Sequence, residues 1–327
     1  MDYAPNSRNS VSVTSMKKKS KPSIGFIGFG EAGSSIAKGL KASGLQRISA
    51  YDINRDSSDL GPGIQTRAKE TETTLVDSSE ALAGTAGILI STVTCDRAIE
   101  AAEQTARFLD SHHIYADLNS VSPAVKQSID KIISASGAGF VEAAVMSPVP
   151  PYEHRAPMLI GGSAASKFAG LMTPYGMRLE ILPGAVGAAA ATKMFRSIVM
   201  KGMEALVLEC VLAASRYNAE GRVFASLTET FPGMDWEKLA NYMVGRVVVH
   251  GERRAHEMEE VAETLRSMGI EPIMAEATAR RQEWCARLGV RSRFDANGPQ
   301  SYRHALRAIA EATDAGNMST ARKKGEA

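Results

Sequence analysis

Apolar runs alternate with amphipathic segments along the first half of the chain. The apolar runs have the length and composition of buried strands. They span residues 24–28, 48–52, 87–93, 114–118, 139–145, 156–160 and 179–182. Segments 34–43 and 98–109, which lie between them, have the period of helices. This alternation predicts an α/β fold with a doubly wound parallel sheet.

The pattern changes after Pro183. Residues 188–217 contain no proline and carry apolar side chains on nearly every face, as a central buried helix does. The charged residues among them would be costly in lipid, which excludes a membrane-spanning helix. Segments 235–242 and 253–268 also have a helical period. The second half of the chain is therefore expected to be all-α.

Composition narrows the class of protein. With 327 residues, 44% hydrophobic and 23% charged, the chain has the size of two domains and the composition of a globular enzyme. A net charge of +2 argues against a nucleic-acid partner. Cys95, Cys210 and Cys285 are widely spaced, which disfavours disulfides and a metal site and indicates a cytoplasmic protein. Residues 1–22 lack an apolar run for a signal peptide or membrane span, and we expect a disordered tail there.

A glycine-rich turn follows the first apolar run. Residues 28–33 match the G-x-G-x-x-G motif of dinucleotide-binding Rossmann domains, and they lie between a strand and a helix as that motif requires. Gly28 permits the tight turn, Gly30 lets the backbone approach a pyrophosphate, and Gly33 allows close helix packing. The start of the helix then directs free N–H groups at the anion. The residues expected to contact the cofactor are Gly28, Phe29, Gly30, Glu31, Ala32 and Gly33, with Thr92 and Val93 at the end of the apolar run 87–93.

The second apolar run ends at Asp52. A carboxylate at this place accepts hydrogen bonds from the adenine ribose hydroxyls of NAD and repels the extra phosphate of NADP. Arg55 follows three residues later and could pair with that phosphate, so NADP is the alternative. Asp52 could also be only a turn residue after a strand. We expect NAD.

Four segments together resemble the superfamily of 6-phosphogluconate dehydrogenase and 3-hydroxyacid (3-hydroxyisobutyrate) dehydrogenase. They are residues 24–30, the loop Asp117-Leu118-Asn119-Ser120-Val121-Ser122-Pro123, the stretch 141–162, and the glycine-led helix start 184–193. Segments 231–236 and 250–258 resemble the C-terminal domain of a poorly characterised prokaryotic subgroup. The resemblance implies an NAD(P)-binding Rossmann domain at 23–183 and an all-helical substrate and dimerisation domain at 184–327. It also implies a homodimer that shares its C-terminal helices.

The resemblance places the catalytic lysine of the superfamily at Lys193. It places substrate contacts at Asn119 and Ser120. The chain departs from the pattern at Ser197, where the superfamily has Asn, at Met200, where 6-phosphogluconate dehydrogenases have Glu, and at 146–148, where Met-Ser-Pro replaces Ser-Gly-Gly. Ser147, on that last loop, is a further candidate for substrate contact because ligands bind at the carboxyl ends of parallel strands.

Lys193 suits proton transfer. Removal of hydride from an alcohol carbon leaves a proton on oxygen, so a base is needed, and a lysine serves only if its pKa is lowered. We expect burial and the nearby cations Arg196 and Lys201 to lower it. The alternative is a lysine that extends from a helix start into solvent.

The side chains of Lys193, Ser197, Lys201 and Glu204 recur on one face of the predicted helix, which should face the cofactor. Ser197 could bind the substrate hydroxyl or carboxylate, or could bond to its own preceding turn. Arg196 and Lys201 suggest a substrate with two anionic groups. The alternative is that these two side chains serve only as an ion pair with Glu204 and as an interface residue.

Four basic residues in segment 250–258 have two alternative interpretations. His250, Arg253, Arg254 and His256 could reach the active site of a partner subunit, although a solvent-facing helix is the commoner arrangement and the one we expect. The favoured function is an NAD(P)-dependent oxidoreductase that transfers hydride between nicotinamide and a small, anionic 3-hydroxyacid. An imine reductase on the same fold, or a dinucleotide-binding sensor without turnover, is the alternative.

Overall fold

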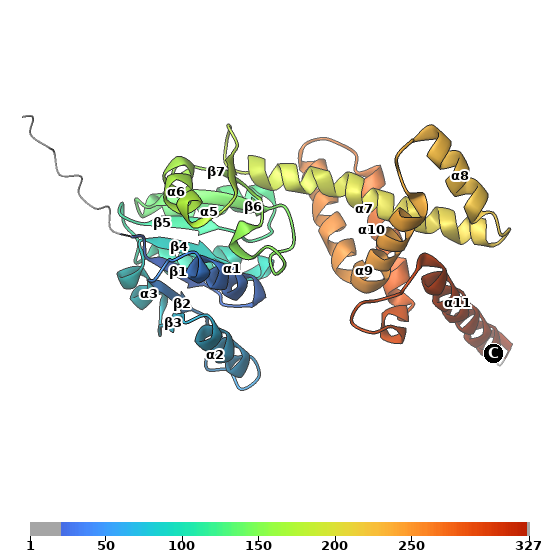
Figure 1. Ribbon diagram of the computed structural model, residues 1–327, viewed down its shortest axis with the longest axis horizontal. Coiled ribbons are helices and arrows are strands. Elements are labelled where there is room, and N and C mark those ends of the chain that lie inside the picture. Colours follow the sequence, from blue (N-terminus) through green and yellow to red (C-terminus); the bar gives the residue numbers. More distant parts are fainter. Residues whose placement is uncertain (1–20, 326–327) are drawn as a thin grey trace, which may run out of the picture.

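The computed structural model describes residues 21–325, so residues 1–20 of the expected tail lie outside the described residues. Figure 1 shows one lobe built around a sheet and a second lobe of helices, connected by a long helix, α7. Within the described part, no helix is long and apolar enough to cross a membrane.

Eight strands form one sheet in the order β3-β2-β1-β4-β5-β6-β7-β8. All neighbours are parallel except β6 and β7, which are antiparallel. The strands are β1 (Ile24–Ile27), β2 (Ile48–Tyr51), β3 (Thr74–Leu75), β4 (Ile88–Ser91), β5 (Ile114–Asp117), β6 (Gly139–Val145), β7 (Met158–Gly161) and β8 (Leu179–Ile181). The predicted α/β Rossmann class is confirmed, although β3 was not predicted because its two residues carry no alternating pattern.

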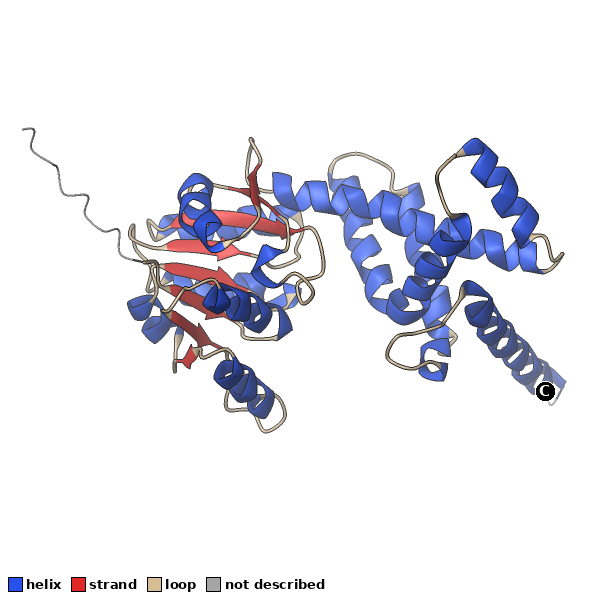
Figure 2. Cartoon of the chain, in the orientation of Figure 1, coloured by secondary structure: helices blue, strands red, loops and turns tan. Residues whose placement is uncertain are grey.

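Helices cover both faces of this sheet, as Figure 2 shows. They are α1 (Glu31–Ala42), α2 (Gly61–Glu70), α3 (Ser79–Thr85), α4 (Ala98–Ala106), α5 (Pro123–Ala135) and α6 (Ala165–Met172). Side chains of α1, α2 and α6 belong to one apolar core, and those of α3, α4 and α5 to another. A sheet covered on both faces explains why its strands are apolar throughout rather than alternating.

The second lobe is helical, as predicted. Its helices are α7 (Ala188–Ser215), α8 (Glu220–Thr230), α9 (Trp236–Ser267), α10 (Ile273–Arg287) and α11 (Tyr302–Gly325). The two segments expected as separate helices are one helix, α9, because buried residues such as Met243 and Val247 continue its apolar face between them. A Cβ at Gly251 would lie 2.9 Å from the Gln282 carbonyl oxygen, so this glycine allows α10 to pack closely on α9.

Candidate functional site

The glycine turn connects β1 to α1 at the carboxyl edge of the sheet, where the strand order reverses between β1 and β4. Gly28 has a φ of +80°, and a Cβ there would lie 2.8 Å from Val93 Cγ1. A Cβ at Gly33 would lie 2.7 Å from Thr92 Oγ1, whereas one at Gly30 would meet no atom within 4 Å. The turn is thus tight on its protein side and open on its outer side, where a pyrophosphate would approach.

The three non-glycine residues of the motif lie in different surroundings. Glu31 is exposed in the first turn of α1, and Ala32 lines a cavity described below. The Phe29 ring is fully buried against Phe26, and its backbone N–H donates to Asp52 Oδ2 at 2.7 Å. Phe29 therefore holds the turn in shape from inside the protein.

Asp52 is buried at the end of β2. Its second carboxylate oxygen, Oδ1, accepts a hydrogen bond from the Asn54 N–H at 2.9 Å, so the residue fixes the local turn as well as lining a cavity. Arg55, the candidate for NADP phosphate, forms ion pairs with Asp77 and with Asp56. These acidic partners raise the pKa of Arg55 and hold its guanidinium group in a local cluster.

Three connected cavities follow the carboxyl edge of the sheet. The turn cavity, about 490 Å³, is lined by Gly28, Gly30 and Asp52. The central cavity, about 770 Å³, lies between the sheet and α9, and Thr92 and Val93 line both of these cavities. The inner cavity, about 380 Å³, extends between α7 and α9 and shares several residues with the central one. Shared by the central and inner cavities are Asn119, Ser120, Val145, Ser147, Lys193, Arg253, Glu257 and Glu260.

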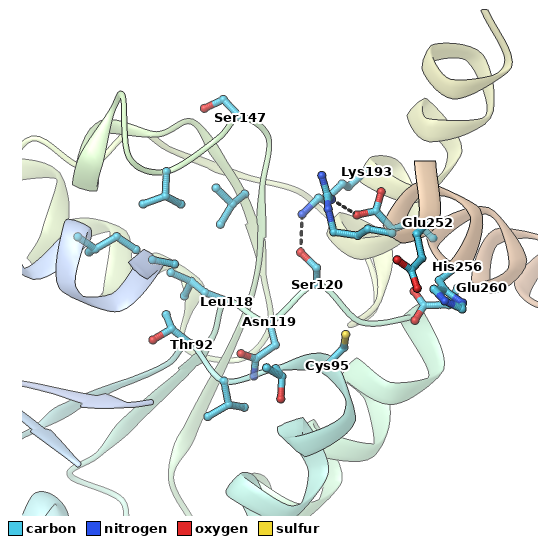
Figure 3. Close-up of a pocket in the computed structure, with 18 residues that line it drawn as sticks. Thr92, Cys95, Leu118, Asn119, Ser120, Ser147, Lys193, Glu252, His256 and Glu260 are labelled. Atoms are coloured by element: carbon cyan, nitrogen blue, oxygen red, sulfur yellow. Dashed lines mark hydrogen bonds and ion pairs between the residues drawn. The ribbon is translucent and has the colours of Figure 1, made fainter. Parts of the chain in front are cut away.

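Lys193 lies in the second turn of α7, where the central and inner cavities meet. Its Nζ donates to Ser120 Oγ at 2.7 Å, as the dashed line in Figure 3 shows. Burial of the amine, followed by the charge of Lys126, lowers the Lys193 pKa to about 8. Lys201 and Arg253 lower it further, while Glu257 opposes the shift. The expected contribution of Arg196 is absent, since Arg196 is exposed.

The helix that carries Lys193 is anchored by a buried carboxylate. Glu142 of β6 has no solvent exposure, and its Oε1 accepts from the Gly187 N–H at 2.8 Å and the Ala189 N–H at 3.4 Å. Its Oε2 accepts from the Ala190 N–H at 3.4 Å. A negative charge at a helix N-terminus is favourable, so Glu142 fixes where α7 begins and how far Lys193 stands from the sheet.

Asn119 and Ser120 follow β5 directly. Asn119 is only 4% exposed, and its Nδ2 donates to Ser91 Oγ at 2.9 Å and to Asp117 Oδ1. Its Oδ1 has no hydrogen-bond partner. Both residues line the central cavity below Lys193 (Figure 3). Ser147 stands across the cavity from Lys193, and its buried hydroxyl also lacks a partner.

The polar face of α7 is occupied mainly by internal contacts. Ser197 Oγ donates to the Lys193 carbonyl oxygen at 3.3 Å, which is the preceding-turn bond considered as an alternative. Lys201 Nζ lies 2.8 Å from Glu257 Oε2. Glu204 is paired with Arg254, not with Lys201. All of these side chains except Glu204 nevertheless line the inner cavity.

Arg253 and His256 of α9 are exposed, as expected, although both also line the central cavity, whereas the expectation is wrong for the buried Arg254. Arg254 is 5% exposed and paired with Glu204, and Arg253 and His256 line the central cavity of their own chain. His250 is half-buried, and neighbouring arginines add to burial in lowering its pKa. Figure 3 shows Glu252, His256 and Glu260 on the helix that forms the wall next to Lys193.

Several site residues were missed by sequence reasoning. Glu252, Glu257 and Glu260 share one face of α9 with His256, and this spacing was the available signal. Lys126 was also missed, although it occupies the apolar face of α5. Among the described residues, no group of three His, Cys, Asp or Glu side chains is arranged to hold a metal ion.

The fold and the glycine turn define a dinucleotide-binding protein of the Rossmann class. Residues 23–172 match the family described as the NAD binding domain of 6-phosphogluconate dehydrogenase, and residues 214–285 match a domain of unknown function, DUF1932. The chain belongs to the 6-phosphogluconate and 3-hydroxyacid dehydrogenase-like oxidoreductases, in the group that carries the DUF1932 domain.

Relatives agree with this assignment. A conserved hypothetical protein from Sinorhizobium meliloti is 33% identical, with a TM-score of 0.76 over 90% of this chain and 97% of its own. A conserved protein of unknown function, described as structurally similar to 3-hydroxyacid dehydrogenases, is 28% identical, with a TM-score of 0.70 over 82% of this chain and 98% of its own. The mitochondrial 3-hydroxyisobutyrate dehydrogenase of Drosophila melanogaster is 27% identical over 218 residues, 65% of this chain and 64% of that enzyme.

Proposed function

We propose that this protein is an NAD-dependent dehydrogenase or reductase that acts on a small 3-hydroxyacid, with Lys193 as general acid and base. The observation that carries the proposal is the position of the Lys193 amine. It lies at the wall of the central cavity, bonded to Ser120 Oγ at 2.7 Å, with a pKa near 8. A general base works best when its pKa lies near the operating pH.

The residues present fit a dinucleotide. The open space above Gly30 and the free N–H groups at the start of α1 suit a pyrophosphate, and the central cavity next to Thr92 has room for a nicotinamide ring. When bound, the cofactor accepts or supplies the hydride. During oxidation the neutral Lys193 amine takes the proton from the substrate hydroxyl, and during reduction its ammonium form returns that proton to the carbonyl oxygen.

The ribose end of the site supports NAD over NADP. The Asp52 carboxylate lines the turn cavity, where each oxygen keeps a lone pair free beyond its one backbone N–H contact. A phosphate placed beside it would meet a buried negative charge. Arg55, the cation that could offset this repulsion, is already paired with two carboxylates.

The inner cavity supports an anionic substrate. Seven cationic side chains line it, against two carboxylates, Glu257 and Glu260. Asp117 and Glu204 lie behind the wall and pair with Lys126 and Arg254. Together, these charged side chains keep an excess of positive charge around the inner cavity, and that excess attracts anions into it. The cations are Lys126, Lys193, Arg196, Lys201, Arg246, Arg253 and Arg254.

A substrate with two anionic groups would use this excess. Lys201 and Arg253 are both paired with Glu257, so Arg196, which forms no ion pair with the described residues, is the better candidate for the second group than Lys201. Arginine can bind a carboxylate through two parallel hydrogen bonds. Dicarboxylic or phosphorylated 3-hydroxyacids are thus the substrates to test first.

We also propose a homodimer. Val199 and Leu206 are seven residues apart on α7 and are 61% and 59% exposed, respectively. Large apolar side chains along one face of a central helix are typical of an interface. Sedimentation velocity across a concentration series would test the dimer, and a Leu206→Glu variant should shift it to monomer.

A substrate screen tests the function. NADH formation is followed with branched, sugar-derived and dicarboxylic 3-hydroxyacids, with wild type and Lys193→Met. We expect turnover of an anionic hydroxyacid by wild type and a loss of about 100-fold or more in the variant, as is usual for removal of a general base. NADH binding by both proteins shows that the variant is folded. Stoichiometric NADH binding with no turnover across the panel would instead support a sensor, and full activity in the variant would refute the role of Lys193.

A further inference from the structure

Lys126 is a buried cation in the wall of the inner cavity. It is 1% exposed and lies on the apolar face of α5 with Ile129 and Ile133. Its Nζ donates to the Asp117 carbonyl oxygen at 2.7 Å, to Asp117 Oδ2 at 2.9 Å and to the Ala143 carbonyl oxygen at 3.4 Å. These three acceptors use all three of its N–H groups.

Stability alone is a poor reason for this arrangement. Removing two charges from water costs several kcal/mol per ion, and apolar side chains of similar size often replace buried ion pairs without loss of stability. The rest of the face of α5 is apolar, and a methionine at position 126 would continue it. The ion pair is therefore expected to serve the site beside it.

The contacts of Asp117 extend the ion pair to the cavity. Its Oδ1 accepts from the Asn119 backbone N–H at 3.2 Å and from Asn119 Nδ2. Because Nδ2 must point at this carboxylate, Asn119 Oδ1 is turned the other way and remains without a partner. Ser120 follows and holds the Lys193 amine. Lys126 is thereby linked through Asp117 to the loop that contacts Lys193.

The charge of Lys126 also acts directly on Lys193. After burial, Lys126 is the largest influence that lowers the Lys193 pKa. Lys201, from the same helix as Lys193, and Arg253, from α9, act in the same direction, and Glu257 opposes them. The other charged or titratable side chains of α7 and α9 that line the two cavities beside Lys193 are Glu252, His256, Glu260, Arg196, Arg246 and Arg254.

We propose that Lys126 is a positioning residue of the dehydrogenase site: paired with Asp117, it holds the loop of Asn119 and Ser120 and presents a fixed positive charge to the Lys193 amine. The proposal rests on the proposed function for its catalytic meaning. It assigns a role to a residue whose amine is engaged by Asp117 and the Ala143 carbonyl oxygen and which acts through Lys193 and the loop.

The test removes the pair without leaving a lone buried charge. The double variant Lys126→Met/Asp117→Asn keeps an oxygen acceptor for Asn119 but no charge. Lys131→Met, an exposed lysine of the same helix, is the matched control. Lysines are dimethylated with ¹³C-formaldehyde, the Lys193 signal is assigned with Lys193→Arg, and its chemical shift is followed by NMR from pH 6 to 11. This readout does not depend on activity.

We expect the Lys193 signal to titrate near pH 8 in wild type and in Lys131→Met. In the double variant the midpoint should rise, by roughly half a unit or less, because loss of the Lys126 charge is partly offset by loss of the opposite charge of Asp117. The midpoint of the kcat/KM profile should rise with it. An unchanged midpoint in a folded double variant would overturn the role of Lys126, whatever the activity. The expected rise without turnover of any hydroxyacid would count against the dehydrogenase alone.

Discussion

The rate of hydroxyacid oxidation should depend on pH through Lys193. Only the neutral amine accepts a proton, so kcat/KM should increase about tenfold per pH unit below the Lys193 pKa, which is near 8, and level off above it. Reduction needs the ammonium form and should decrease above pH 8. At pH 7 about 9% of the amine is neutral with a pKa of 8, against about 0.03% with the ordinary pKa, so the site gains about 300-fold in active base.

Initial rates of NADH formation at limiting substrate measure this dependence, because kcat/KM reports the free enzyme. The profile is recorded from pH 6 to 10.5 with wild type and with Lys193→Met. The variant should lose the inflection near pH 8 together with most of its rate. A wild-type inflection above pH 10, or a flat profile through pH 8, would show that the amine is not desolvated as its surroundings indicate.

Three further changes have defined outcomes. Glu142→Gln removes the charge that caps α7 at Gly187 and should lower the free energy of unfolding in urea by about 2–3 kcal/mol, and no change would refute the cap. Asp52→Ser should shift the ratio of NADP to NAD affinity toward NADP by about tenfold or more, which NAD(P)H fluorescence titration measures, and an unchanged ratio would refute its role. Lys193→Met should raise unfolding stability at pH 7 by about 1–2 kcal/mol, discounted for partial exposure, because at that pH the folded wild type carries a charged amine in surroundings that lower its pKa to about 8. That gain should disappear as pH rises from 8 toward 10.5, and a gain independent of pH would contradict it.

The parts of the site that could be predicted from sequence are those fixed by local structure. The glycine turn at 28–33 follows from a strand, three glycines and a helix start that are contiguous in the chain. Asp52 follows from the end of one strand. The position of Lys193 at the start of an apolar helix predicted that its amine is buried. The direction of its pKa shift followed from that burial.

The parts that could not be predicted depend on how distant segments pack. Arg196, three residues from Lys193, was expected to act on its pKa, yet it is exposed, while Lys126 acts across the contact of α5 with α7. A lysine in an amphipathic helix is most often solvated. Only the place of Lys126 with Ile129 and Ile133 on the apolar face of α5 indicated that this lysine is buried. Which residues of α7 and α9 pair, such as Lys201 with Glu257, depends on how these two helices cross.

The crossing of α7 and α9 explains where substrate preference should reside. The sheet lobe supplies the cofactor turn, Asn119 and Ser120, whereas α9 supplies the charged wall that includes Arg253, His256 and Glu257. All of α9 lies within the DUF1932 match at residues 214–285, so the domain that marks this group is the one that lines the central cavity beside Lys193. Substitutions on this face of α9 should therefore change which acid is accepted while leaving NADH affinity intact. The same substitutions would leave the turn at Gly28 untouched, because no side chain of α9 lines the turn cavity.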